Sequence, residues 1–232
     1  MLRKIIVGDL NAKLCALLKN QLETFPFHNL GQLLGKKVIN GGTCFDHALS
    51  LRAHITKMGL SGTLHEAEVC MTGLNSHRLI RVESSDKVSF LDSGTGWPTI
   101  YQAHACDIYR EYTSAGIRFR IVKESNKLLV KRHDGRQWRD MNRIALVAQN
   151  EEIILSKYPN RYLQQLPYSQ ELRFCWLMNE KFYRITGFCL AVYEAGKNTQ
   201  KYSLTPIELL RFVQSSFPEL ISDLKIYLES IS

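Results

Sequence analysis

The stretch NGGTCFDHAL (residues 40–49) places a cysteine, Cys44, directly after Gly41, Gly42 and Thr43. Thr43 is a good N-cap residue, so we expect the thiol in the first turn of a helix. Unpaired N–H groups and the dipole at a helix N-terminus favour negative charge, and so the thiolate form. The glycines allow close backbone approach and leave space in front of the sulfur. This pattern favours nucleophilic attack by sulfur, although a buried structural role is commoner for cysteines in general.

A nucleophilic cysteine needs a base, and the base needs a group that orients it. His77 opens HRLIRVESSDKVSFLD, which is typical of a hairpin that turns at Ser85–Asp86. With a two- or four-residue loop, paired positions sum to 171, so His77 and Asp92 lie diagonally on one face with Cα atoms about 7–8 Å apart. An odd loop would send Asp92 to the other face. The pair is geometrically available, but spacing alone favours a surface histidine and a turn aspartate.

His47 and the other five cysteines are further residues that could take part in chemistry. His47 follows Cys44 by three residues on the same expected helix, so its ring could touch the sulfur. We expect it at the helix surface, because the base of such a triad normally comes from another element. The remaining five cysteines are scattered singly with no Cys-x-x-Cys pair, so we predict structural roles, no zinc site and no redox dithiol: Cys15, Cys70, Cys106, Cys175 and Cys189.

The composition excludes several classes of protein. Of the 232 residues, 45% are hydrophobic and 22% charged, as in ordinary globular domains. No apolar run reaches about 18 residues, so no membrane span is expected. The apolar run in the start, MLRKIIVGDL, is too short for a secretory signal. We therefore expect a cytoplasmic location and reduced thiols.

The net charge of +8 is unevenly distributed. Nine basic and three acidic residues lie between Arg118 and Arg143. The basic residues alternate with apolar ones, which is typical of half-buried strands with solvated faces. A groove for a polyanion is the less favoured interpretation, and we predict no nucleic-acid partner because no nucleic-acid motif accompanies the charge.

The elements that would position these residues follow from periodicity. Residues 10–23 carry leucines at helical spacing and end before Pro26, and 43–58 form a second amphipathic helix. From about 65 to 150 the chain contains short β-rich segments separated by polar turns. Further strands follow in 169–195. Two helices close the chain, the first opened by Thr205, Pro206 and Glu208 as a capping box. This order predicts an α+β fold with an antiparallel sheet or barrel.

Four pieces in order resemble one known family: PFHNL (26–30), GGTCF (41–45), His77 opening HRLIRV, and DSGTG (92–96). The arylamine N-acetyltransferases carry Pro-Phe-Glu-Asn-Leu, Arg-Gly-Gly-x-Cys-Phe, a histidine that opens an apolar strand, and Asp-x-Gly-x-Gly. The interval of 15 from His77 to Asp92 is similar to theirs. Looser similarity extends the resemblance from about residue 24 to 215.

The resemblance implies a fold and a reaction. The fold would be an N-terminal helical bundle (1–62), a central β-barrel (63–150) and a C-terminal α/β lid (151–232), with a papain-like Cys-His-Asp core. Cys44 would accept an acetyl group from acetyl-CoA, with no metal, and pass it to a small-molecule arylamine or hydrazine in a ping-pong reaction. His77 would pair with Cys44 and shuttle protons, and Asp92 would fix the imidazole.

The same resemblance implies binding residues. Phe27 would form an apolar wall of the acceptor pocket, although plain core is an equally simple interpretation of it. Thr95 stands where some members have Phe and others Ser, which implies a roomier pocket. Contacts to CoA are expected from Thr72 and Gly73, which precede His77, and from Asn160 and Tyr162, which flank Arg161 after Pro159.

Two departures accompany the resemblance. The family's Arg before Gly-Gly is Asn40 here, and its Glu in Pro-Phe-Glu-Asn-Leu is His28. If those charges pair in family members, both have been replaced together, which a buried pair tolerates better than the loss of one partner. Two alternatives stay open: a thiol hydrolase or transglutaminase-like enzyme that uses the same triad, and a retired homologue that only binds a ligand. The sequence leaves the oligomeric state undetermined.

Overall fold

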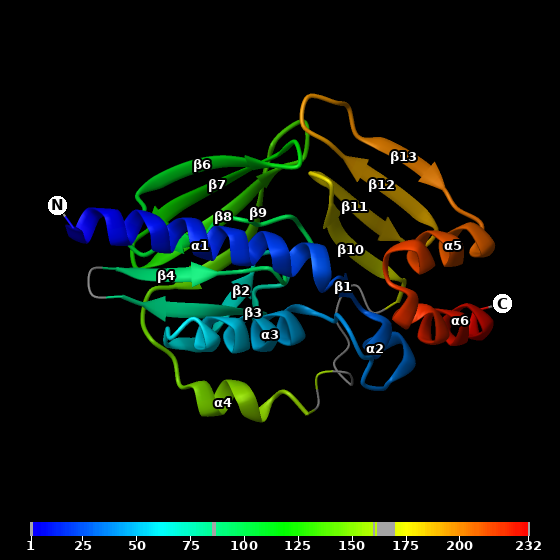
Figure 1. Cartoon of the computed structure of the whole chain (residues 1–232), viewed down its shortest axis with the longest axis horizontal. Helices are drawn as coiled ribbons and strands as arrows, with labels where there is room; N and C mark the ends of the chain where they lie inside the picture. Colours follow the sequence, from blue (N-terminus) through cyan, green and yellow to red (C-terminus); the bar gives the residue numbers. More distant parts are fainter. Residues whose placement is uncertain (1, 85–86, 160, 162–169, 232) are drawn as a thin grey trace.

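The computed structural model describes residues 2–84, 87–159, 161 and 170–231. Two antiparallel sheets lie side by side, with helices packed on their outer faces and ends (Figure 1). This is the α+β arrangement that the order of the elements predicts.

The first sheet has eight strands in the order β5-β4-β3-β2-β9-β8-β7-β6. The strands from β2 to β4, and those from β6 to β9, pair in chain order through short turns. Strand β5 pairs with β4 after the longer connection 92–102, and β5 and β6 form the two edges of the sheet. Strand β2 also pairs with β9, which brings the start and the end of the β-rich region together. Its strands are β2 (Gly62–Val69), β3 (Leu74–Glu83), β4 (Val88–Leu91), β5 (Ala103–His104), β6 (Tyr109–Ser114), β7 (Ile117–Glu124), β8 (Lys127–His133) and β9 (Trp138–Ala145).

The second sheet has five strands in the order β1-β10-β11-β12-β13. Its edge strand β1 (Phe27–His28) comes from the N-terminal region, and it pairs with β10 from a point almost 150 residues later. The other strands are β10 (Arg173–Met178), β11 (Lys181–Thr186), β12 (Cys189–Tyr193) and β13 (Gln200–Ser203). A strand from the C-terminal region therefore pairs with a strand from the N-terminal region.

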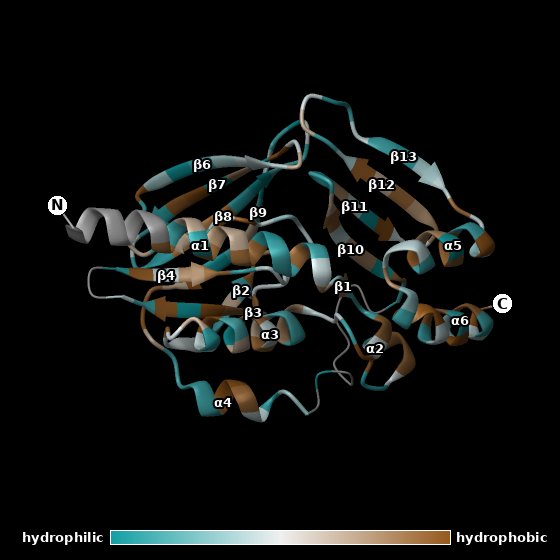
Figure 2. Ribbon diagram, in the orientation of Figure 1, coloured by the Kyte–Doolittle hydropathy of each residue, from teal (hydrophilic) through white to brown (hydrophobic). Residues whose placement is uncertain are grey.

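The helices cover both sheets. Helices α1 (Leu2–Thr24) and α3 (Cys44–Lys57) pack on the first sheet through a shared apolar cluster that includes Leu18, Leu51 and Ile55. On the second sheet, Trp176 and Phe174 pack against the apolar faces of α5 (Pro206–Ser216) and α6 (Ile221–Ser230), which carry both polar and apolar residues (Figure 2). The remaining helical segments are α2 (Leu30–Leu34), α4 (Glu151–Ser156) and the 3-10 turn η1 (Pro218–Leu220).

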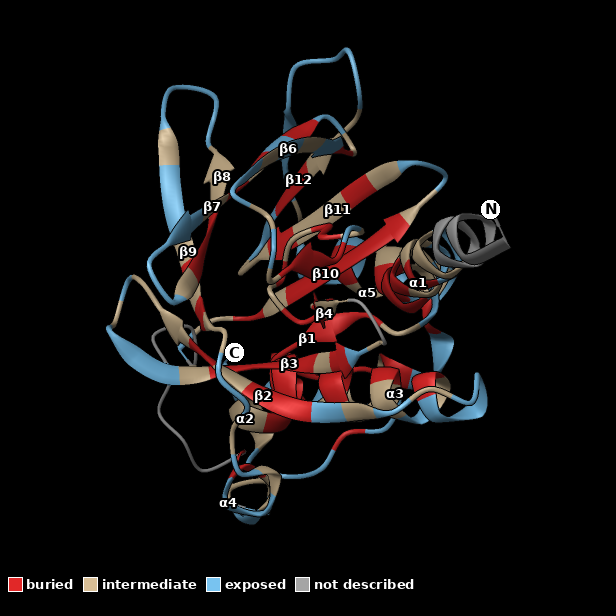
Figure 3. Cartoon of the chain, turned by 90° about the vertical axis from the view of Figure 1, so that its left-hand side faces the viewer, coloured by how far each residue is buried: buried red, intermediate tan, exposed pale blue. Residues whose placement is uncertain are grey.

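Burial is greatest where sheets and helices meet. Buried residues gather along β1, β10 and α3, whereas the ends of the outer hairpins are exposed (Figure 3). The segment that carries Cys44 therefore lies in the interior of the molecule and not at its rim.

The predicted helices and most of the predicted strands are confirmed, with differences at element ends and in short elements. The first helix begins at Leu2 instead of residue 10. Six short elements have no counterpart in the prediction, because segments of two to six residues show too little periodicity: β1, β5, β6, β13, α2 and α4. Met58, the last residue of the expected helix 43–58, is 38% exposed and follows the last turn of α3.

Candidate active site

Cys44 is the first residue of α3, as the capping pattern predicts. The N-cap is Thr43, and a capping box joins it to Asp46, whose carboxylate accepts the Thr43 N–H at 3.1 Å. Cys44 is 7% exposed, and its Sγ lies 3.8 Å from the carbonyl oxygen of Ser76 on β3. The helix start therefore holds the thiol against the strand that carries His77.

The hairpin formed by β3 and β4 has the predicted register. Ile80 pairs with Leu91 and Val82 with Ser89, so that paired positions sum to 171. In this register His77 Nε2 lies 2.6 Å from Asp92 Oδ2. The second carboxylate oxygen of Asp92 accepts the N–H of Gly94 at 3.0 Å, which fixes the carboxylate in the turn after β4.

The protonation of His77 follows from its surroundings. Its side chain is 6% exposed, and this burial alone would lower the pKa. The Asp92 carboxylate and a hydrogen bond with the Cys44 side chain outweigh the burial and raise the pKa of His77 to about 10. The imidazole therefore carries its proton at neutral pH while it contacts both Asp92 and the sulfur. This is the arrangement in which an imidazolium stabilises a thiolate.

The glycines around Cys44 act differently from the expectation. A Cβ at Gly41 would lie 2.5 Å from the Pro26 carbonyl oxygen, so Gly41 allows the loop to approach β1 and does not open space at the sulfur. Gly42 adopts a φ of 142° and faces the Asp46 side chain. The glycine that packs on the nucleophile is Gly94, where a Cβ would lie 2.5 Å from the Cys44 Cα.

The surface position expected for His47 is wrong. His47 is fully buried, and its Nδ1 lies 3.3 Å from the hydroxyl of Ser93. Its ring packs edge-on against Phe25, and burial lowers its pKa to about 3. A neutral histidine in an aromatic environment is a packing residue and a hydrogen-bonding partner for the turn that follows Asp92.

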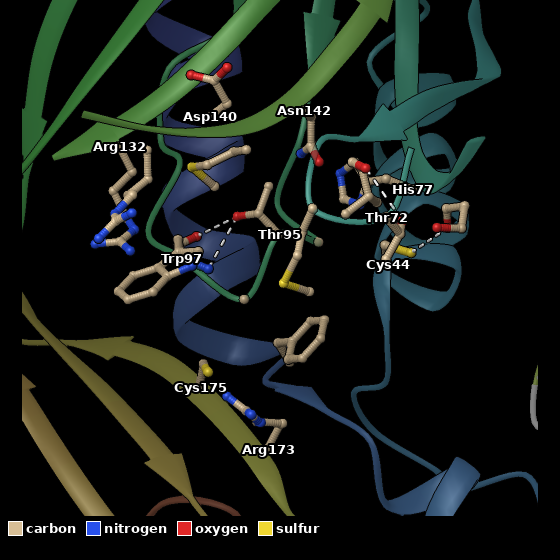
Figure 4. Close-up of a pocket in the computed structure, with 18 of the residues that line it drawn as sticks. Cys44, Thr72, His77, Thr95, Trp97, Arg132, Asp140, Asn142, Arg173 and Cys175 are labelled. Carbon is tan, nitrogen blue, oxygen red and sulfur yellow. Dashed lines mark hydrogen bonds between the residues drawn. The ribbon is translucent and has the colours of Figure 1, made fainter. Parts of the chain in front are cut away.

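A cavity of about 390 Å³ opens beside Cys44 and His77 (Figure 4). Phe27 and Thr95, both expected in the acceptor pocket, line it. The Thr95 hydroxyl accepts the Trp97 N–H at 3.1 Å, so a short turn presents Thr95 and Trp97 to the same space. The cavity is large enough for a small organic ligand.

The residues expected to contact CoA are only partly brought together. Thr72 lines the cavity beside Cys44 and His77. Gly73 does not line it. It lies in the β2–β3 turn with a φ of 68°, a conformation that suits glycine. Asn160 and Tyr162 lie outside the described residues. Arg161, between them, is buried and donates from Nε to Asp46 at 3.0 Å, so it secures the start of α3.

Several cavity residues have no counterpart in the sequence prediction. Arg132 lies in the basic stretch assigned to solvated strand faces, and Trp97 directly follows the DSGTG motif. Both could have been found as neighbours of predicted features. Others come from the second sheet or from β9, where no pattern relates them to Cys44: Asn142, Arg173, Cys175 and Arg184.

His28 and Asn40, the two departures from the family pattern, are in contact through the Asn40 backbone carbonyl. His28 is buried, its Nε2 lies 3.2 Å from the Asn40 carbonyl oxygen, and burial lowers its pKa to about 4. The Asn40 side chain is exposed and bonds with Glu219. The two departures therefore do not form a buried pair of neutral side chains in this protein, because the Asn40 side chain is exposed while that of His28 is buried.

The family model for N-acetyltransferase of the arylamine type matches residues 9–222. The chain belongs to the arylamine N-acetyltransferase family. It is an enzyme of that type, as the resemblance implies. Comparison with curated protein sequences gives no match.

Solved structures of arylamine N-acetyltransferases share the fold. The enzyme from Nocardia farcinica has 20% identity and a TM-score of 0.76, over 92% of this chain and 86% of that chain. The enzyme from Mycobacterium marinum has 14% identity and a TM-score of 0.81, over 95% and 91%. Its complex with CoA also matches, with a TM-score of 0.79, 14% identity and coverage of 92% and 88%.

In the part of the chain that the structure describes, no helix is long and apolar enough to cross a membrane. Across the same described residues, no group of three or more His, Cys, Asp and Glu side chains is arranged to hold a metal ion.

Proposed function

We propose that this enzyme moves an acetyl group from acetyl-CoA to the nitrogen of an arylamine or hydrazine through a thioester on Cys44. In the first half-reaction the Cys44 thiolate attacks the acetyl carbonyl, and the bond between that carbon and the CoA sulfur breaks. The leaving CoA thiolate takes the proton that His77 holds. One difficult transfer is thereby divided into two easier ones.

In the second half-reaction the amine nitrogen attacks the acetyl-Cys44 carbonyl. His77, neutral after the first step, accepts the proton that the nitrogen loses, and the Cys44 sulfur leaves as a thiolate. Both charges of the starting pair are restored. Asp92 stays ionised and holds the imidazole in position throughout.

The observation that carries this proposal is the continuous contact from Cys44 to His77 to Asp92 at the wall of a cavity. A buried cysteine that were only structural would not require a protonated imidazole with its own carboxylate. The family membership supports the acetyl donor, and the CoA complex of the Mycobacterium marinum enzyme supports CoA as its carrier. We assign the acceptor wall to Phe27 and Thr95, and a CoA contact to Thr72.

The test is to mix the enzyme with acetyl-CoA labelled in the acetyl group and to digest it. We expect label on Cys44, none in Cys44→Ser, and discharge of the label to an added arylamine. Label that is lost to water at the same rate with and without amine would support a hydrolase. Absence of label, together with iodoacetamide reactivity no greater than that of a free cysteine, would support a homologue that only binds.

A further inference from the structure

Two arginines contact the Trp97 ring on the wall of the cavity. The Cζ atom of Arg132 on β8 is 3.8 Å from the centroid of the Trp97 ring, and that of Arg184 on β11 is 4.8 Å away. All three side chains line the cavity. The two sheets thus each bring one guanidinium to the same indole, which attracts both cations but neutralises neither.

Arg132 and Arg184 differ from the other arginines of the cavity in their lack of a carboxylate. Among the described residues, neither forms an ion pair. The other two arginines that line the cavity do, within 4 Å: Arg139 with Asp134 and Arg173 with Glu171. The arrangement leaves two positive charges that face an open space and have no acidic partner.

The surroundings of Arg132 stabilise its positive charge poorly. Its Nε is buried and has no hydrogen-bond partner. Burial lowers the pKa of Arg132, and the neighbouring charge of Arg184 adds to that effect against the influence of Tyr193. Such a group is stabilised when an anion enters, because a charge-assisted hydrogen bond replaces both an unmet donor and a repulsion.

The position of the pair relative to the nucleophile indicates what the anion belongs to. Arg132 and Trp97 lie across the cavity from Cys44, with Thr95 between them (Figure 4). An arylamine whose amine points at the Cys44 thioester would point the opposite end of its ring toward Arg132 and Trp97. The phosphates of CoA fit this position less well, because the long pantetheine arm separates them from the sulfur that reacts at Cys44.

We propose that the Arg132–Trp97–Arg184 cluster binds an anionic group, a ring carboxylate, on the acceptor arylamine at the end remote from its amine. The inference rests on the proposed function and narrows its substrate class. Two guanidiniums donate to the carboxylate oxygens, and the indole holds both in place. A neutral acceptor leaves the two arginines without an acidic partner and gains none of this binding.

The closing experiment measures binding apart from turnover. The probes are 4-aminobenzoate and its neutral isostere 4-aminobenzamide, titrated calorimetrically into unacylated enzyme. We expect the wild type to bind the carboxylate about tenfold or more tightly than the amide, as charged hydrogen bonds allow. The double variant Arg132→Gln/Arg184→Gln should lose that preference and bind the amide as before.

The control is Arg118→Gln, which removes one guanidinium charge, as each single variant does, from an exposed position on β7 where Arg118 pairs with Glu111. It should keep the preference. If the double variant fails to fold, as a thermal melt reports, Arg184→Gln alone should lose part of the preference. Equal binding of the two probes by the wild type, or a preference that survives in the variants, would overturn the inference.

The two half-reactions, measured separately, distinguish an acceptor carboxylate from the phosphates of acetyl-CoA as the anion that the cluster binds. Acylation of Cys44 by acetyl-CoA should be unaffected in the double variant, while discharge by 4-aminobenzoate slows by the same factor as binding weakens. Slowed acylation with unchanged acceptor preference would assign the pair to CoA and overturn our assignment. A wild type that prefers 4-aminobenzoate but is never acylated would contradict the proposed function and leave the anion site standing.

Discussion

At the scale of single residues, the central feature is a buried histidine that keeps its proton. The raised pKa of His77 depends on Asp92 and Cys44, since burial alone acts in the opposite direction. The consequence for chemistry is that an acid able to protonate the leaving CoA is present before the donor binds.

We predict that the His77 ring stays protonated through neutral pH and titrates near pH 10, and that Asp92→Asn lowers this value. Because the folded pKa lies above the ordinary 6.5, the bound proton stabilises the fold fully below pH 6.5, and this contribution is lost as the pH rises to about 10. Ring NMR of wild type and variant measures both values. Titration of wild-type His77 near its ordinary pKa would contradict the prediction.

A second prediction concerns Gly94, which leaves no room for a side chain against Cys44. Gly94→Ala should lower the free energy of unfolding by about 1–3 kcal/mol, because the new methyl group meets backbone that cannot yield. It should also slow the acylation of Cys44. Chemical denaturation and the labelling assay measure the two effects.

Gly62→Ala is the matched control. Neither Gly62 nor Gly94 has a left-handed φ, so steric contact alone distinguishes the two substitutions. A Cβ at Gly62 meets side-chain methyl groups, the Cγ2 atoms of Ile80 and Ile55 at 3.0 and 3.2 Å, and no backbone atom at such short range. An equal loss of stability in the two variants would show that backbone contact at Cys44 is not the cause.

At the scale of elements, the first turn of α3 is held from outside the helix. Asp46, besides capping Thr43, accepts from Arg161 at 3.0 Å and from the Tyr158 hydroxyl at 3.3 Å. The side chains of Asp46 and Arg161 are only 10% and 7% exposed. The residues after α4 therefore fix the helix end that carries the nucleophile.

Asp46→Asn should lower the free energy of unfolding by about 3 kcal/mol, because it leaves the buried Arg161 without its charged partner. Adding Arg161→Met should recover part of that loss. Arg52→Gln is the control, since the ion pair between Arg52 on α3 and Glu151 on α4 is about one-third exposed. We expect it to cost less than about 1 kcal/mol by urea denaturation. Equal costs for Arg52→Gln and Asp46→Asn would refute the argument.

At the scale of the whole molecule, one residue joins the N-terminal region to the second sheet. Asn29 is fully buried, donates from Nδ2 to the Glu171 carbonyl at 2.8 Å, and accepts the Arg173 N–H at 2.7 Å. It follows Phe27 and faces Arg173, which both line the cavity. The cavity wall depends on this junction.

Asn29→Ala should lower the free energy of unfolding by at least about 2 kcal/mol, because two buried backbone groups lose their partners at about 1–3 kcal/mol each. We also expect a higher KM for the acceptor. Asn198→Ala, on an exposed turn, should change stability by less than about 0.5 kcal/mol. A thermal melt and acceptor kinetics provide the measurements. Wild-type stability in Asn29→Ala would contradict this account of the junction.

The sequence by itself determined the local geometry of the candidate site. The cap at Thr43, the start of α3 at Cys44 and the hairpin register that aligns His77 with Asp92 all depend on spacing within one element or between strand neighbours. Such features need only backbone periodicity and turn length. The predicted division at residues 62 and 150 stays a prediction, and β1 already crosses it by pairing with β10.

Only the tertiary structure decided which distant residues complete the cavity. Cys175, Arg173 and Arg184 reach it because β1 pairs with β10, and no local pattern encodes the partner of a two-residue edge strand. The same packing buries His47, whose place on the helix gave no sign of it. Contacts between segments far apart in the chain depend on how whole surfaces fit, and that information is spread over every residue of both surfaces.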